Sequence, residues 1–314
     1  MRIAIVGAGL AGLAACFHLI QKKCTVSLFD SQGIGGGASG IATGLLHPYP
    51  GEKARRSWNA AEALESTRKL LKISEAALGY PVASYSGILR YAIDAEQQAH
   101  LVDRTRTFDD IEQVGEREFL IHSGMTVYTP LYLKGLWQAC RQGGAIFHQE
   151  CISSLSSLDA YDHVILACGM GVFELAPIKL SYVKGQVLTA RWPNSLPPLT
   201  RSLIGKGYVG MCADARLCHL GATFERNFTH RGSDQDFALR DLVPKIAAFF
   251  PQVHELSIVG CQSNFRVTRP GSYLPLIERF NEKCSIFTAL GSRGLLYHAY
   301  FAEILSRNVL NSVI

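Results

Sequence analysis

Short apolar runs and a glycine-rich turn alternate at the start of the chain. Residues 2–6 form a run rich in β-branched side chains, which predicts a buried strand. The segment Gly7-Ala8-Gly9-Leu10-Ala11-Gly12 follows directly, and residues 13–21 are typical of a helix. A second apolar run, residues 25–29, ends at Asp30. Strand, glycine turn, helix, strand and acid in this order predict a βαβ unit.

The pattern downstream predicts further helices and strands in alternation. Helices are expected over residues 54–78, 132–142 and 234–249, and from a glycine turn at 291–294 to about 311. Strands are expected over residues 83–93, 145–148 and 162–167, in several runs up to about 224, and over 257–268 and 285–290. The 54–78 helix is amphipathic, with Leu64, Leu71 and Leu78 on one stripe.

The β-rich middle between two α/β ends predicts an α/β protein whose two domains are interleaved. We expect a cofactor domain from residues 1–80, 145–180 and 257–314, and a substrate domain from 81–144 and 181–256. A simple nicotinamide dehydrogenase would instead continue to add βα units after the first.

Composition limits the class of protein. The chain has 314 residues, 48% of them hydrophobic, which is enough for a large core in one or two domains. No apolar run reaches the ~18 residues of a membrane span. The first strand leaves no room for a signal peptide, so we expect a cytoplasmic protein without a membrane partner. Nine scattered cysteines without a CxxC pair indicate reduced thiols and no metal site, and a net charge of +5 would tolerate a polyanionic partner.

The glycine turn carries the chemistry of a dinucleotide site. Gly7 permits the tight turn, Gly9 lets the backbone approach a pyrophosphate, and Gly12 lets the helix pack close to the strand. The helix N-terminus offers N–H groups and a positive dipole end to phosphates. Asp30 can accept hydrogen bonds from ribose hydroxyls. The alternative is a glycine-rich turn in another kind of α/β protein.

Several further segments carry a family resemblance. They are residues 36–40, 44–49, 164–169, 184–188, 221–225, 266–270, 275–277 and 291–295. With the glycine turn, they make the chain resemble the FAD-dependent D-amino-acid oxidase/glycine oxidase (DAO) family over nearly its whole length. The resemblance implies a glutathione-reductase-like FAD-binding βαβ domain and an interleaved antiparallel β-rich substrate domain.

The same resemblance implies where FAD would bind. The implied contacts are Gly7, Gly9, Leu10, Ala11, Gly12, Asp30, Ser31, Ala38, Ser39, Gly40, Leu45, Leu46, Ile152, Ala167, Gly169, Gly291, Ser292, Arg293, Gly294 and Leu295. Ser39 would donate its hydroxyl near the pyrophosphate and ribityl chain. The turn at 291–295 would direct a helix N-terminus at the flavin N1–C2=O edge, where reduced flavin is negative. Arg293 either adds charge there or is a surface residue of a helix cap.

Arg266 is the implied substrate residue. A guanidinium can hold a carboxylate through two parallel hydrogen bonds and so direct the α-carbon toward the flavin. Its spacing to Pro275 is one residue longer than expected, which leaves Arg269 as a rival. Tyr208 is a second catalytic candidate, with a core aromatic as the equal alternative. His47 and His298 are interpreted as structural, because amine oxidation needs a neutral amine but no dedicated strong base.

Two segments, residues 38–40 and 221–227, resemble more narrowly the C-terminal oxidase domains of bifunctional tRNA wobble-uridine enzymes (MnmC type). Those domains remove the carboxymethyl group of 5-carboxymethylaminomethyl-uridine in tRNA. Since residue 1 already opens the first strand, the methyltransferase half of such enzymes would be missing. This departure is compatible with a stand-alone oxidase and weakens the tRNA assignment.

The expected reaction oxidises a glycine-type amine by hydride transfer from the α-carbon to the flavin. The imine would hydrolyse, and O2 would reoxidise the flavin. A tRNA substrate would need a cationic site entrance, for which the Lys and Arg residues of 53–56 and 68–72 are candidates beside the alternative of a solvated helix face. A free amino-acid oxidase (glycine, sarcosine or D-amino acid) and a non-catalytic flavoprotein stay as alternatives.

Overall fold

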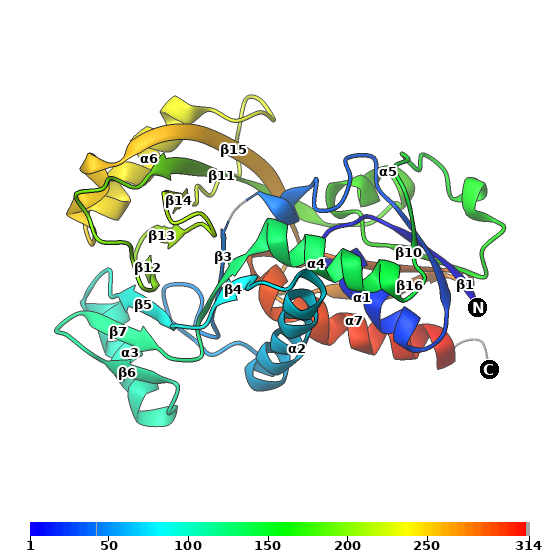
Figure 1. The fold of residues 1–314 in the computed structure, drawn as a ribbon, viewed down its shortest axis with the longest axis horizontal. Coiled ribbons are helices and arrows are strands. Elements are labelled where there is room, and N and C mark those ends of the chain that lie inside the picture. Colours follow the sequence, from blue (N-terminus) through cyan, green and yellow to red (C-terminus); the bar gives the residue numbers. More distant parts are fainter. Residues whose placement is uncertain (42, 312–314) are drawn as a thin grey trace.

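Two large β-sheets stand side by side in the computed structural model, which describes residues 1–41 and 43–311 (Figure 1). One sheet is largely parallel and is covered by helices, and the other is largely antiparallel. The expected α/β class, with parallel and antiparallel sheets from interleaved segments, is therefore confirmed.

The first sheet has six described strands from three separate parts of the chain. In spatial order these are β16 (Leu276–Asn281), β17 (Cys284–Thr288), β10 (His163–Leu166), β1 (Arg2–Val6), β2 (Thr25–Phe29) and β9 (Ile146–His148). All neighbouring pairs are parallel except β16 with β17. Their runs of buried apolar residues explain why strands from distant parts of the chain meet in one sheet.

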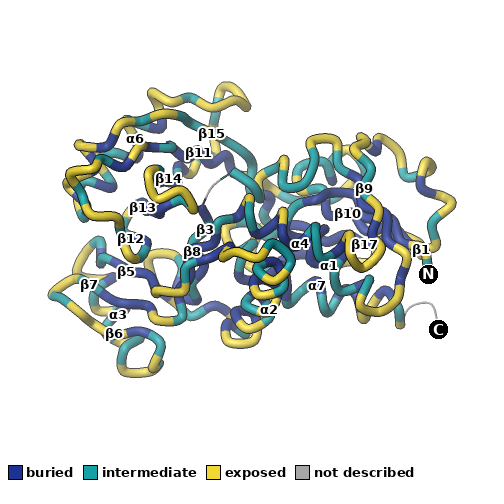
Figure 2. The backbone as a smooth tube through the Cα atoms, in the orientation of Figure 1, coloured by how far each residue is buried: buried dark blue, intermediate teal, exposed yellow. Residues whose placement is uncertain are grey.

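Helices cover one face of this sheet. They are α1 (Leu10–Gln21), α2 (Ala60–Leu78), α4 (Thr129–Gln142) and α7 (Gly294–Asn311). These helices pack against one another, and α1 also contacts β1, β2 and β17. The strands at the centre of the sheet and α1 are buried along most of their length, whereas the connecting loops are exposed (Figure 2). On the other face, a smaller apolar cluster includes Leu158, Val172 and Ala176 and the short helix α5 (Val172–Leu175).

The second sheet has eight strands and forms a broad wall beside the first. In spatial order these are β15 (Ser257–Thr268), β11 (Ser181–Arg191), β14 (Leu217–Gly221), β13 (Tyr208–Met211), β12 (Ser202–Ile204), β5 (Ile88–Tyr91), β7 (Glu118–Ile121) and β6 (Ile111–Gln113). Within this second sheet, β12 and β5 form the one parallel pair among the described strands. Helix α6 (Gln235–Ala247) packs on this sheet through Ala238, Leu242 and Ile246.

A small antiparallel sheet joins the two halves. It consists of β3 (Thr43–Leu46), β8 (Met125–Tyr128) and β4 (Ala83–Ser84). Among the described helices, none is long and apolar enough to cross a membrane.

One expected helix begins later than predicted, and one helix was not predicted. The helix expected over residues 54–78 begins at Ala60, because Ala54 and Asn59 have positive φ angles (43° and 44°) that a right-handed helix does not allow. Helix α3 (Ala95–Thr107) lies in a stretch for which no helix was predicted. The sequence contains a start signal for this helix, Asp94 followed three residues later by Gln97. The Asp94 side chain accepts from the Gln97 amide (2.8 Å), as in a capping box.

Two elements pair across the predicted domain boundaries. β15 belongs to the eight-stranded sheet, although residues 257–268 were assigned to the cofactor domain. Helix α4 packs on α1 and α2, although it was assigned to the substrate domain. The division into two domains stays a prediction.

Candidate functional site

A cavity of about 830 Å³ lies where the carboxyl ends of the parallel strands meet the second sheet. Open parallel sheets bind ligands at this edge. Val6, Phe29, Ala167 and Thr288, at the ends of or directly after four of the strands, line the cavity. All residues predicted to contact FAD or substrate line it except Gly12 and Gly40.

The glycine turn forms one wall through its backbone. Gly7 has φ +110°, and a Cβ there would lie 2.4 Å from the Ala167 carbonyl oxygen. A Cβ on Gly12 would lie 1.8 Å from the Gly7 carbonyl oxygen, so α1 packs directly against the turn. Gly9 precedes α1, and no side chain caps the helix there. Gly9 therefore offers no side chain of its own to the first N–H groups of α1, and no acidic residue lies in the first helical turn.

Ser39 and Asp30 fix the surroundings of this turn. The Leu10 amide donates to Ser39 Oγ (3.1 Å), which leaves the Ser39 hydroxyl proton free for another acceptor. Asp30 accepts from the Ala8 amide through Oδ2 and from the Gln32 amide through Oδ1, each at 2.8 Å. These bonds orient the carboxylate at the cavity edge, and its remaining lone pairs are available to hydroxyl donors.

The start of α7 forms a second wall of backbone. Gly291 has φ +54°, and a Cβ on nearby Gly44 would lie 2.2 Å from Leu295 Cδ1. The Arg293 guanidinium stacks on the exposed ring of Tyr273 at 4.4 Å. Arg293 Nε is buried without a hydrogen-bond partner among the described residues.

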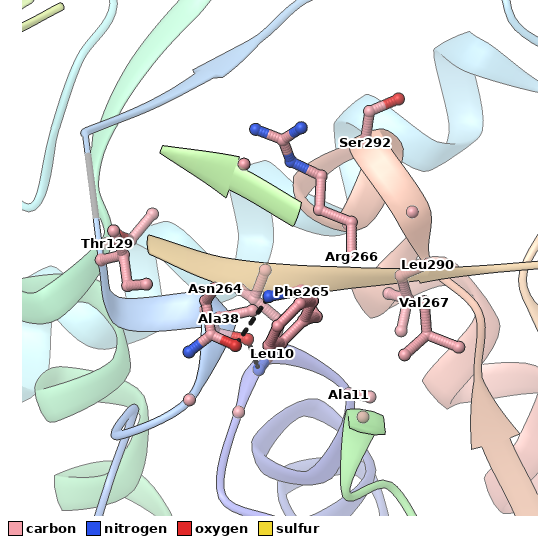
Figure 3. Close-up of a pocket in the computed structure, with 18 of the residues that line it drawn as sticks. Leu10, Ala11, Ala38, Thr129, Asn264, Phe265, Arg266, Val267, Leu290 and Ser292 are labelled. Atoms are coloured by element: carbon pink, nitrogen blue, oxygen red, sulfur yellow. Dashed lines mark hydrogen bonds between the residues drawn. The ribbon is translucent and has the colours of Figure 1, made fainter. Parts of the chain in front are cut away.

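Arg266 lies across the cavity on β15. Its side chain and Ser292 lie on the same side of the strand, whereas Asn264 and Phe265 extend toward Leu10 and Ala38 (Figure 3). A Cβ on Gly185 would lie 2.5–2.9 Å from the guanidinium, which therefore rests on the backbone of β11.

No described carboxylate forms an ion pair with Arg266. Among the described residues, its one hydrogen bond runs from Nη1 to the Thr223 carbonyl oxygen and measures 3.5 Å. Burial lowers the pKa of Arg266, and nearby Tyr208 opposes this shift. The rival Arg269 is exposed and lies outside the cavity lining.

Tyr208 contacts the cavity beside Arg266. A Cβ on Gly221 would lie 2.6–2.7 Å from the tyrosine ring and hydroxyl, so the ring covers this glycine. Burial raises the pKa of Tyr208 to about 12, and Arg266 opposes the shift. Tyr208 is thus a neutral phenol over the ordinary pH range.

The two histidines differ in their access to the cavity. His298 is fully buried between the Tyr132 hydroxyl (2.6 Å) and the Gly294 carbonyl oxygen (2.9 Å), and burial lowers its pKa to about 4. His47 lines the cavity, and its Nδ1 accepts from the Tyr49 amide (3.3 Å). Burial and then Arg90 lower the pKa of His47 to about 3. Both rings are neutral at neutral pH.

Other lining residues were not predicted. They include Thr43, Thr129, Glu150, Cys151, Lys206, Asn264 and Phe265. Asn264 and Phe265 directly precede Arg266, so their place could have been inferred from the strand. The others come from loops and strand ends whose position depends on distant pairing. Among the described residues, no group of three His, Cys, Asp or Glu side chains could hold a metal ion.

Comparison with known proteins gives a consistent picture. A family model described as "FAD dependent oxidoreductase" (DAO) matches residues 2–308. A bifunctional protein of tRNA 5-methylaminomethyl-2-thiouridine biosynthesis, MnmC from Maricaulis maris, is 26% identical over 99% of this chain and 52% of its own length. The chain thus spans about half the length of the curated MnmC proteins it matches.

Two further proteins match over nearly their whole length. Human D-aspartate oxidase is 24% identical, over 95% of this chain and 91% of its own length. The crystal structure of glycine oxidase from Geobacillus kaustophilus superposes with a TM-score of 0.79 at 18% identity, covering 99% of this chain and 95% of that chain. The latter likeness concerns the fold.

Proposed function

The chain belongs to the family of FAD-dependent oxidoreductases, and from this premise we propose that it oxidises the C–N bond of a glycine-type amine. The substrate would carry a carboxymethyl group on nitrogen, and the reaction would release the free amine and a 2-oxo acid. Water supplies the oxygen of the new carbonyl group.

One observation carries this proposal: Arg266 presents a guanidinium to the cavity without a carboxylate partner among the described residues. A partly buried cation of this kind favours an anionic ligand, since desolvation is offset when an opposite charge binds. The planar fork of the guanidinium matches a carboxylate through two hydrogen bonds. Tyr208 offers a neutral phenol beside it as a further donor.

The residues opposite Arg266 fit FAD. A Cβ on Gly9 would lie 2.7 Å from Ser39 Oγ, so only a glycine lets the turn and Ser39 approach each other closely beside the cavity, where a pyrophosphate would bind. Asp30 would hold the ribose, Ser39 would donate to the pyrophosphate or ribityl chain, and Ile152 with Ala167 and Gly169 would contact adenine. The turn at 291–294 would direct N–H groups at the flavin. When bound, FAD accepts the two electrons that leave the substrate.

The specific substrate that we propose is 5-carboxymethylaminomethyl-uridine in tRNA. It is supported by the name of the Maricaulis maris relative and by the net charge of +5, which suits a polyanionic partner. Arg266 would hold the carboxylate of the modified base, and the base would need to be turned out of its stack. We expect O2 to act as the electron acceptor.

A second candidate is oxidation of a free amino acid. It is supported by human D-aspartate oxidase, of which the match covers 91%, whereas the MnmC matches cover about half. The same Arg266 would then bind the α-carboxylate.

Anaerobic reduction of the FAD-loaded protein tests both candidates. The visible flavin absorbance is followed after mixing with tRNA bearing carboxymethylaminomethyl-uridine, with unmodified tRNA, or with glycine, sarcosine or D-aspartate. Bleaching by the modified tRNA alone is the expected result, and admission of O2 should then restore the colour with formation of peroxide. Bleaching by a free amino acid alone would support the second candidate. An absorbance that no amine changes would contradict both.

A further inference from the structure

A short segment after β14 continues the antiparallel pairing of β14 along β11. The Thr223 amide donates to the Gln186 carbonyl oxygen (3.1 Å). Lys184 and Glu225 exchange two backbone hydrogen bonds, at 3.0 and 2.9 Å. Residues 223–225 are therefore held in register on β11, directly beside Gly185, on which the Arg266 guanidinium rests.

Four polar side chains are buried around this segment, and we name them the Glu225 cluster: Lys184, Gln186, Thr223 and Glu225. Lys184, Gln186 and Thr223 are at most 1% exposed, and the Glu225 side chain is 9% exposed. Such burial is expensive for polar groups unless each finds a partner.

Glu225 is the centre of the cluster. Its Oε1 accepts from the Thr223 hydroxyl and from Gln186 Nε2 (3.0 Å), and its Oε2 lies 3.7 Å from Lys184 Nζ. Lys184 Nζ also donates to the His230 carbonyl oxygen (3.1 Å). The Glu225 carboxylate thus connects Lys184 and Gln186 of β11 with Thr223, at the other end of the segment.

The cluster extends to the backbone on either side. The Thr223 hydroxyl oxygen accepts from the Gln186 amide (2.8 Å). Gln186 Oε1 accepts from the Asp234 amide (2.6 Å), at the start of α6. The loop between β14 and α6 is therefore fixed at several points by one buried network, and such networks stabilise a single arrangement.

Thr223 connects this network to the cavity. Its carbonyl oxygen is the atom that accepts from Arg266 Nη1 (3.5 Å). Its side chain and amide are held by Glu225 and Gln186, so the position of that carbonyl depends on the cluster. No described acid reaches Arg266 to orient it instead.

We propose that Glu225 is a positioning residue that holds Arg266 in the orientation that binds a carboxylate, acting through Thr223. This inference rests on the proposed function, since it assumes that Arg266 binds the substrate carboxylate. The alternative is that the cluster stabilises the fold and has no influence on ligand binding.

Glu225→Gln tests the proposal because it keeps the size of the side chain and removes its charge. Binding to the FAD-loaded protein is measured through the change in flavin absorbance with two ligands of similar shape. Methoxyacetate has a carboxylate and no oxidisable amine, and 2-methoxyacetamide is its neutral counterpart. We expect Kd for methoxyacetate to rise about tenfold, with a change below about twofold for the amide. Glu278→Gln, at an exposed acid on β16, is the matched control and should change neither value.

A structural role would lower the unfolding temperature of Glu225→Gln without changing the ratio of the two Kd values, and an unchanged ratio would overturn the proposal. If Glu225→Gln does not bind FAD, Thr223→Val removes only the linking hydroxyl and is judged by the same ratio. Arg266→Gln tests the proposed function separately from the positioning role of Glu225. It should abolish the preference for the carboxylate, and if it does not, the proposed function fails and not merely the positioning role.

Discussion

The two ends of the cavity are built from different parts of the chain. At the glycine turn and the start of α7, the wall consists of backbone, and its shape depends on the absence of side chains at Gly7, Gly12 and Gly44. At the opposite end, two side chains, Arg266 and Tyr208, project from strands of the eight-stranded sheet. A backbone wall suits a constant ligand such as a cofactor, whereas a side-chain wall can be altered to suit different substrates.

The largest effect is expected from Gly7→Ala. The new Cβ would meet backbone atoms of Ala167 and Cys168 at 2.4–2.7 Å, and the φ of +110° is strained for any side chain. We expect a loss of about 2–5 kcal/mol in the free energy of unfolding and of most bound FAD. Absorbance of the purified protein at the flavin band and chemical denaturation measure the two effects.

Gly37→Ala is the control for this change. Gly37 also lines the cavity, but a Cβ there has no atom within 4 Å and its φ is −87°. It should retain FAD. Equal loss of FAD in both variants would mean that close backbone approach does not distinguish the glycine turn.

Arg266→Gln should have the next largest effect, on the substrate and not on FAD. We expect kcat/KM for a carboxylate substrate to fall by about 10²–10³, since a charge-assisted pair is lost, while bound FAD is unchanged. Arg269→Gln, at the exposed neighbour, should remain within about twofold. Were Arg269→Gln the damaging variant, the carboxylate would have to be assigned to the other arginine.

The stability of the fold beside the backbone wall should depend on pH through His298, which is hydrogen-bonded to the Gly294 carbonyl oxygen. Its folded pKa of about 4 lies below the ordinary 6.5, so the folded protein binds fewer protons than the unfolded chain between these values. Its contribution to stability is therefore complete above pH 6.5 and falls as the pH decreases toward 4, by about 3 kcal/mol at most.

His298→Gln should remove this part of the acid sensitivity. Thermal unfolding is measured at pH 7, 5.5 and 4.5. The difference in unfolding temperature between the wild-type protein and His298→Gln should decrease as the pH falls, because the wild-type protein loses stability faster. His47, His163 and His219 also have lowered pKa values, so some acid sensitivity should persist in the variant. Parallel curves for the two proteins would refute the assignment to His298.

Tyr208→Phe should have the smallest effect. No hydrogen bond links its hydroxyl to another described residue, so its removal leaves no buried group unpaired within the protein. We expect KM for a carboxylate substrate to rise about threefold to tenfold, the value of one neutral hydrogen bond. An unchanged KM would make Tyr208 a packing residue over Gly221.

The glycine turn could be predicted from sequence because its determinants are local. Gly7, Gly9, Gly12 and Asp30 lie within one βαβ unit, and their spacing alone specifies the turn. The family resemblance added the turn at 291–295, which also lines the cavity.

The side-chain wall could be predicted only as a choice between candidates. Whether Arg266 or Arg269 faces the cavity depends on where β15 ends and how it pairs with β11, over a separation that local patterns do not specify. The parallel β5–β12 pair and the contact of Thr223 with Arg266 depend on similarly distant segments. Glu225 and its buried partners lie in two segments that carry the family resemblance, residues 184–188 and 221–225, but no local pattern in the sequence shows that these segments pair with each other.

The order of strands in the six-stranded sheet has a consequence in time. Within this sheet β1 is synthesised before β10, although Ile3 pairs with His163, and β10 in turn pairs with residues 284–286. At a synthesis rate of roughly 5–20 residues per second, β1 is complete about 10–30 s before β10, and during this time one edge of β1 is unpaired. A nascent chain of this kind is exposed to aggregation during synthesis, and FAD, whose site needs both the first turn and the start of α7, would bind after translation has passed residue 294.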